Sequence, residues 1–161
     1  MLQLRYTHFL YCLLFLFIGS INLCRAQEQS KLPVKFTAKI PEVVHIGEKF
    51  NVNIFLDIQD SWYIYAPTGT NAEQGMLEAS ITFELPEGIV MEEKIQWPEP
   101  MVKDLYQVYM GKIKIRPLFK VQPETKSGLY KIKAKLRYQS CNSVFCLPPL
   151  EENLLIEVKI K

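Results

Sequence analysis

The clearest pattern in the chain is a strict alternation of apolar and polar residues. Apolar side chains at every second position place one face of a strand on a core and the other face in water. Four segments follow this pattern over most of their length: 34–40, 50–58, 130–138 and 156–160. Shorter apolar segments predict four further strands at 63–65, 79–85, 89–97 and 113–121.

Glycine and proline separate these segments, as expected where strands end in turns. They lie in four short stretches: 45–48, 85–88, 97–100 and 122–128. No segment has helical periodicity, although 72–79 could form one short turn. Seven or eight short strands with regular turns predict an all-β fold, an immunoglobulin-like β-sandwich of two antiparallel sheets. A jelly roll or a small barrel is the alternative.

The N-terminus has the features of a secretory signal peptide. Arg5 precedes the ten-residue apolar run Phe9–Ile18, and a polar break leads to Ala26. The run is shorter than the roughly 20 residues that span a bilayer. We therefore predict a signal peptide at 1–26 and a single domain at 27–161. Two alternatives are an uncleaved anchor and a lipid anchor at Cys24; the large Leu23 before that cysteine disfavours the latter.

The charge balance of the predicted domain is neutral. Of the 19 Lys and Arg residues, Arg5 and Arg25 lie in the leader, so the rest equal the 17 Asp and Glu residues in number. A neutral domain lacks the basic footprint of a nucleic-acid-binding protein. The alternating Lys and Arg at 131–137 form either a patch for an anionic partner or, as we favour, the solvated face of a strand.

Two cysteines carry the candidate chemistry, because Cys12 and Cys24 lie in the leader. Cys141 and Cys146 can face each other on antiparallel strands if the four residues between them turn, and an exported pair is a disulfide candidate. Closing so small a ring adds only about 2 kcal/mol of stability, which slightly favours a redox role over a structural one. With only these cysteines and His45 in the domain, a four-ligand zinc site is not expected, and neither is a cofactor.

The segment YQSCNSVFCLPP at 138–149 resembles the active-site segment of the periplasmic N-terminal domain of the thiol:disulfide interchange protein DsbD. That family has YQ-x-C, a short loop and then C-x-PP. Three other motifs follow in the family's order: DSWYIYA at 60–66, WPEP at 97–100 and YMG at 109–111. The resemblance spans Pro33 to Lys161. The chain departs from the family at Gln107 and Val108, where acidic residues are common, so a pKa-tuning role is not carried over.

The resemblance implies a periplasmic, immunoglobulin-like domain that relays reducing equivalents. Cys141 and Cys146 would be the catalytic pair: Cys146 would enter mixed disulfides with partners, and Cys141 would resolve them. Tyr109, and less strongly Tyr106, would form an aromatic cap over the pair.

Phe145 and Pro148 would contribute to the surface that partners contact. The implied partners are thioredoxin-like donors and acceptors, including those of cytochrome c maturation, with a membrane redox protein acting in trans. A non-catalytic β-sandwich binding module with a structural disulfide is the alternative. The chain shows no Ser-His-Asp set and no phosphate loop, which disfavours an enzyme of another chemistry.

Overall fold

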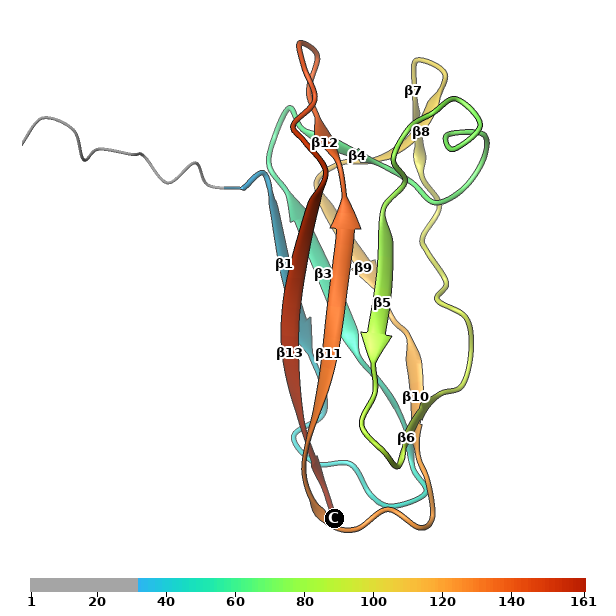
Figure 1. Ribbon diagram of the computed structural model, residues 1–161, viewed down its shortest axis with the longest axis vertical. Helices are drawn as coiled ribbons and strands as arrows, with labels where there is room; N and C mark the ends of the chain where they lie inside the picture. The colour runs from blue at the N-terminus through green and yellow to red at the C-terminus, as the bar shows by residue number, and fades with distance from the viewer. Residues whose placement is uncertain (1–31) are drawn as a thin grey trace, which may run out of the picture. The chain divides into compact units, whose positions relative to one another are not determined.

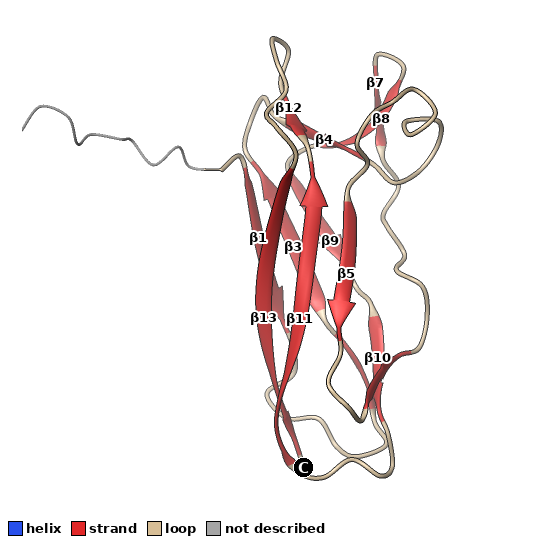
Figure 2. Ribbon diagram, viewed as in Figure 1, coloured by secondary structure: helices blue, strands red, loops and turns tan. Residues whose placement is uncertain are grey.

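The computed structural model describes residues 32–161, so the predicted signal peptide and its cleavage site lie outside the described residues. Within this range every regular element is a strand, and no helix is long and apolar enough to cross a membrane. The strands are β1 Val34–Lys39, β2 Lys49–Asn51, β3 Asn53–Ile58, β4 Tyr63–Tyr65, β5 Ser80–Glu84, β6 Ile89–Met91, β7 Met101–Lys103, β8 Tyr106–Tyr109, β9 Lys112–Ile115, β10 Leu118–Val121, β11 Gly128–Tyr138, β12 Ser140–Cys141 and β13 Leu150–Ile160. The prediction of an all-β, immunoglobulin-like sandwich is confirmed (Figure 2).

One layer of the sandwich is the sheet β13-β11-β5. β11 and β13 pair antiparallel over eleven residues, from Gly128 opposite Ile160 to Tyr138 opposite Leu150. β11 lies between its two neighbours, so its lysines are on a central strand and do not protect a sheet edge. Their side chains point to solvent, as the alternation predicts.

The other layer is the sheet β1-β3-β9, behind the first layer in Figure 1. Two strands predicted as continuous are each divided. The segment 50–58 forms β2 and β3, and 113–121 forms β9 and β10. The division falls at Pro117, which has no N–H to donate to a neighbouring strand but accepts a 3.2 Å hydrogen bond from the Val52 N–H. β2 and β10 continue the layer as the sheet β2-β10-β6.

The core lies between the two layers and consists mainly of apolar positions of the predicted strands, joined by Val44, Ala66 and Tyr109. Its largest fully buried side chains include Phe119, Ile54, Leu136 and Tyr138. Phe119 contacts the ring of Phe50, with ring centroids 5.8 Å apart. Burial at about 25 cal/mol per Å² makes these contacts the main source of stability. This core makes the sandwich a rigid support for the strands at its end.

A fourth sheet, β12-β4-β8-β7, is built of short strands and lies at one end of the sandwich (Figure 1). β12 continues the path of β11 after Gln139 and pairs with β4, so Cys141 lies opposite Tyr63. β7 and β8 form a hairpin in a region where the sequence pattern predicts no strand. The predicted strand 89–97 is also shorter than expected, because only Ile89–Met91 pairs. We call this sheet and its connecting loops the cysteine end.

Candidate functional site: the cysteine hairpin

Cys141 and Cys146 form a disulfide across a short hairpin. Their Cα atoms are 4.0 Å apart and they pair as an antiparallel bridge. Backbone hydrogen bonds flank the pair on both sides: Asn142 N–H to Phe145 O at 3.0 Å, and Leu147 N–H to Ser140 O at 2.9 Å. The predicted opposition of the two cysteines across a four-residue turn is confirmed.

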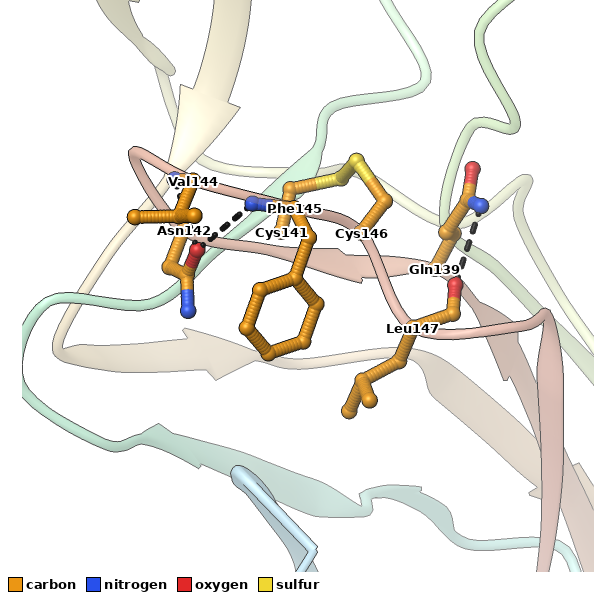
Figure 3. Close-up of a disulfide and its surroundings, with 7 residues drawn as sticks. All are labelled: Gln139, Cys141, Asn142, Val144, Phe145, Cys146 and Leu147. Carbon is orange, nitrogen blue, oxygen red and sulfur yellow. Dashed lines mark hydrogen bonds between the residues drawn. A yellow bond between two sulfur atoms is a disulfide. The ribbon is translucent and has the colours of Figure 1, made fainter.

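The side chain of Asn142 closes the turn. Its Oδ1 accepts hydrogen bonds from the Val144 N–H at 2.8 Å and from the Phe145 N–H at 2.9 Å (Figure 3). Asparagine commonly makes such contacts with the backbone two and three residues later. Gln139 holds the base of the hairpin, because its Nε2 donates to Leu147 O at 3.0 Å. The hairpin is thus held by hydrogen bonds that do not require the disulfide.

The two sulfur-bearing residues have different surroundings. Cys141 is completely buried, whereas Cys146 is exposed. The hairpin tip is apolar and open to solvent: Val144 is 85% exposed and Phe145 is 52% exposed. An incoming thiol therefore reaches the disulfide from the side of Cys146.

Cys141 belongs to a small apolar cluster separate from the main core. Tyr65 and Val108 are its other buried members, and half-buried Tyr106 and Met76 pack against them. The rings of Tyr65 and Tyr106 meet edge to face, with centroids 5.5 Å apart. Burial, with a smaller contribution from neighbouring Tyr63, raises the pKa of Tyr65 to about 12, so its phenol stays neutral near pH 7. The cluster therefore surrounds Cys141 with uncharged groups.

Trp62 supports the hairpin from outside this cluster. Its ring meets that of Phe145 edge to face, with centroids 5.6 Å apart, a favourable arrangement for aromatic pairs. Trp62 lies just before β4, and the preceding residue, Ser61, has a positive φ of 70°. This tight turn directs the chain from β3 into β4 and brings the indole beside the hairpin.

Tyr109 does not lie where the cap prediction places it. Its side chain is 1% exposed and packs in the main core, stacked on Trp97 with centroids 5.6 Å apart. Its hydroxyl donates a 2.6 Å hydrogen bond to Pro98 O, and burial raises its pKa to about 12. This burial does not fit an open cap over the cysteines, because β8 alternates: Tyr106 and Val108 pack in the cluster of Cys141, and Tyr109 points to the opposite face.

Of the other residues considered in the sequence analysis, Pro148 lies beside the cysteines and the cations of β11 do not. Pro148 is exposed two residues after Cys146, beside the hairpin. The cations of β11 do not face the cysteines, since they pair with glutamates on the outer face of their sheet. Examples are Lys133 with Glu84 at 2.8 Å and Lys131 with Glu157 at 3.8 Å. The interpretation of 131–137 as a solvated strand face agrees with these exposed ion pairs.

The loop between β4 and β5 lies against β8 and was not identified from the sequence. Asn71 joins the two segments: its Nδ2 donates to Gln107 O at 2.7 Å, and its Oδ1 accepts from the Gln107 N–H at 3.1 Å. Thr68 Oγ1 adds a 2.6 Å hydrogen bond to the Gln107 side chain. Gln107 thus fastens this loop, which carries Met76, to the strand beneath it.

Comparison with known proteins agrees with this geometry. The family model for the N-terminal domain of the thiol:disulfide interchange protein DsbD matches residues 29–157. The chain therefore belongs to this family of immunoglobulin-like domains, and the suspected resemblance is confirmed. A search of curated proteins gave no significant match.

Two solved structures are similar to this chain. The reduced DsbD N-terminal domain of Neisseria meningitidis has a TM-score of 0.46 and 16% identity, covering 77% of this chain and 86% of that one. The N-terminal periplasmic domain of ScsB from Proteus mirabilis has a TM-score of 0.51 and 10% identity, covering 81% of this chain. This chain spans 48% of the ScsB domain's length, and at these identities the likeness concerns the fold alone.

Proposed function

We propose that this protein is an exported, periplasmic thiol–disulfide exchange domain that passes reducing equivalents to thioredoxin-like partners through Cys141 and Cys146. Membership of the family and the disulfide itself support this role. The observation that carries it furthest is the unequal burial of the two cysteines in one hairpin.

The exchange follows from attack on the exposed sulfur. A thiolate of the electron donor attacks Cys146 Sγ, the Cys141–Cys146 bond breaks, and the electron pair leaves on Cys141 Sγ. A second thiolate of the donor then attacks the donor's sulfur in the mixed disulfide, and Cys146 Sγ leaves with the electron pair. The donor becomes a disulfide, and this domain becomes a dithiol after taking up protons. Two electrons have moved, as thiol–disulfide exchange requires.

Delivery to an acceptor runs through the same atoms in reverse. The Cys146 thiolate attacks the acceptor disulfide, and Cys141 resolves the mixed disulfide, which re-forms the Cys141–Cys146 bond. A thiolate on exposed Cys146 is hydrated, whereas one on Cys141 would lie among apolar side chains, which is costly. Cys146 is therefore the better nucleophile and Cys141 the resolving residue.

The surroundings suggest how a partner is received. Phe145, Val144 and Pro148 form an exposed apolar rim beside Cys146, suited to contact with the apolar surface of a thioredoxin-like protein. Tyr106 shields the buried side of the pair through the cluster around Cys141. Tyr106 thus replaces Tyr109 as the leading cap residue.

Two single-cysteine variants test the assignment as a matched pair. Cys141→Ala keeps exposed Cys146, whose thiolate should attack a thioredoxin-like protein that lacks its resolving cysteine and has its remaining cysteine activated as a mixed disulfide with thionitrobenzoate. Thionitrobenzoate leaves, and the mixed disulfide between the two proteins should accumulate. Cys146→Ala keeps only buried Cys141 and should trap little. Non-reducing gel electrophoresis with mass spectrometry measures both. Equal trapping would contradict the roles of the two cysteines, although not exchange itself.

The reduction potential separates exchange from a structural disulfide. Equilibration with glutathione buffers should give a value above about −300 mV, since structural disulfides in exported proteins usually lie lower. A lower value, together with no reduction by any thioredoxin-like donor, would assign the fold to a binding module with a structural disulfide. N-terminal sequencing of exported protein tests export: a first residue of Gln27 is expected, and a lipid-modified Cys24 would contradict the soluble form.

A further inference from the structure

The outward face of the β1-β3-β9 sheet carries an unusual group of cations. Its four exposed basic residues are Lys35, Lys39, Lys112 and Lys114. The register places Asp57, the one acidic residue of these three strands, opposite Lys35 and Lys112. We call this surface the lysine face. It has three more positive than negative charges, although the predicted domain as a whole is neutral.

The opposite layer of the sandwich shows that such lysines need not be unpaired. On β11, Lys131, Lys133 and Lys135 each lie within 3.8 Å of a glutamate carboxylate. Within residues 32–161, no lysine of the lysine face forms an ion pair. Asp57 therefore offsets only part of the positive charge of this face.

Phe55 lies at the centre of the lysine face. It is half-buried, and two ammonium groups approach its ring: Lys114 Nζ at 5.7 Å and Lys39 Nζ at 6.0 Å from the centroid. A shallow hollow of about 380 Å³ adjoins the ring and is bordered by Lys35, Lys112 and Lys114. An aromatic body surrounded by flexible cations suits a surface that is anionic outside and apolar beneath.

We propose that the lysine face docks the domain onto an anionic phospholipid surface. The type of cation distinguishes this occupant from an acidic protein. Protein interfaces are enriched in Arg, whose planar fork pairs with carboxylates, and depleted in Lys. Every cation of the lysine face is Lys, a point charge on a flexible stem. Clusters of lysines attract a diffuse anionic surface without requiring a fixed geometry.

The position of the lysine face is consistent with this use. β1 is the first strand of the described residues, and the sequence before it contains the apolar run Phe9–Ile18, which contacts a membrane during export if it is the expected signal sequence. The cysteine hairpin lies at the end of the sandwich, not on this face (Figure 1). A domain lying on lipid through this face would keep Cys146 open to partners.

Vesicle sedimentation with the exported protein tests the proposal. Binding to vesicles containing phosphatidylglycerol is compared with binding to vesicles of phosphatidylcholine alone, so that any contribution of an apolar N-terminal segment cancels. We expect binding to the anionic vesicles only, weakened by salt. The triple variant Lys35→Gln, Lys39→Gln, Lys114→Gln should bind about a hundredfold more weakly, at about fivefold for each lysine.

The matched control removes three charges from the other layer: Lys131→Gln, Lys133→Gln, Lys135→Gln. It should keep most of the binding, and equal losses in the two triple variants would overturn the proposal by showing that only net charge matters. Asp57→Asn removes the opposing charge and should tighten binding about fivefold, which misfolding cannot mimic. Binding to immobilised polyglutamate without binding to vesicles would assign the lysine face to an acidic protein and would also overturn the proposal of lipid docking. Disulfide exchange is measured in parallel for each variant. Because the lysine face does not include the cysteines, loss of the lipid-binding proposal would leave the proposed exchange function intact.

Discussion

Apolar and polar side chains alternate both in the body of the sandwich and at the cysteine end, but far more of the apolar side chains are buried in the body. In the body, eleven-residue strands β11 and β13 pair along their full length over a continuous core. At the cysteine end, strands of two to four residues enclose a cluster with only three buried members. Apolar residues even lie open at its loop tips, with Leu105 at 82% and Val144 at 85% exposure.

This difference teaches how a domain can carry a bond that is made and broken. Regions with few buried contacts open at lower free energy than the core does. Because the stability resides in the body, the cysteine end is free to change its covalent state and its contacts. The predictions below test this separation, from the largest expected effect to the smallest.

Two phenylalanines give the sharpest contrast. Phe119→Ala should lower the free energy of unfolding by about 3–5 kcal/mol, because its ring is completely buried against Phe50 and Phe83. Phe145→Ala should cost less than about 1 kcal/mol, since that ring is half exposed. Urea denaturation measures both. Partner exchange should slow only in the second variant, and a comparable loss of stability there would end the distinction between the two regions.

Two tyrosines of β8 belong to different regions: Tyr109 packs in the core of the body, and Tyr106 packs against the cluster of Cys141. Tyr109→Ala should cost about 3 kcal/mol, and Tyr109→Phe about 1 kcal/mol through the lost hydrogen bond to Pro98. Tyr106→Ala should cost less, because the ring is only half-buried, but should speed oxidation of the reduced pair by a small disulfide. Stopped-flow oxidation measures that rate. A faster rate in folded Tyr109→Ala, with no change in Tyr106→Ala, would restore Tyr109 as the cap.

Reduction of the disulfide should leave the sandwich folded. The closed ring is small, so its loss should cost about 2 kcal/mol in the chain-entropy model. Thermal melts of oxidised and reduced protein, followed by circular dichroism, measure the difference. Global unfolding on reduction would mean that the cysteine end supports the body rather than the reverse.

Replacement of Asn142 should have a small and local effect on stability. Asn142→Ala removes the acceptor of two N–H groups in an exposed turn and should cost about 1 kcal/mol. Asn142→Asp keeps an acceptor oxygen and serves as the matched control. In the reduced form, amide exchange at Val144 and Phe145 should rise in the alanine variant only. Unchanged exchange would show that the backbone holds the hairpin without the side chain.

Much of the body could be predicted from the sequence, because a strand that is buried on one face has apolar residues at every second position. The alternation at 130–138 predicted β11, and its apolar members Ile132, Ala134 and Leu136 are indeed completely buried. The spacing of Cys141 and Cys146 likewise predicted a hairpin, since four residues suffice to turn the chain.

Other features depend on contacts between segments far apart in the sequence, and no local residue pattern reveals these contacts. The hairpin β7-β8 escaped prediction because its strands are too short to show a period. Nothing near Phe145 in the sequence indicates that Trp62 packs on it, and nothing local assigns Tyr106 rather than Tyr109 to the cluster of Cys141. The sequence by itself determined the strand pattern and the cysteine pair, which are local properties. Only the tertiary structure decided which cysteine is exposed and which aromatic rings surround the other, because burial depends on how distant strands pack together.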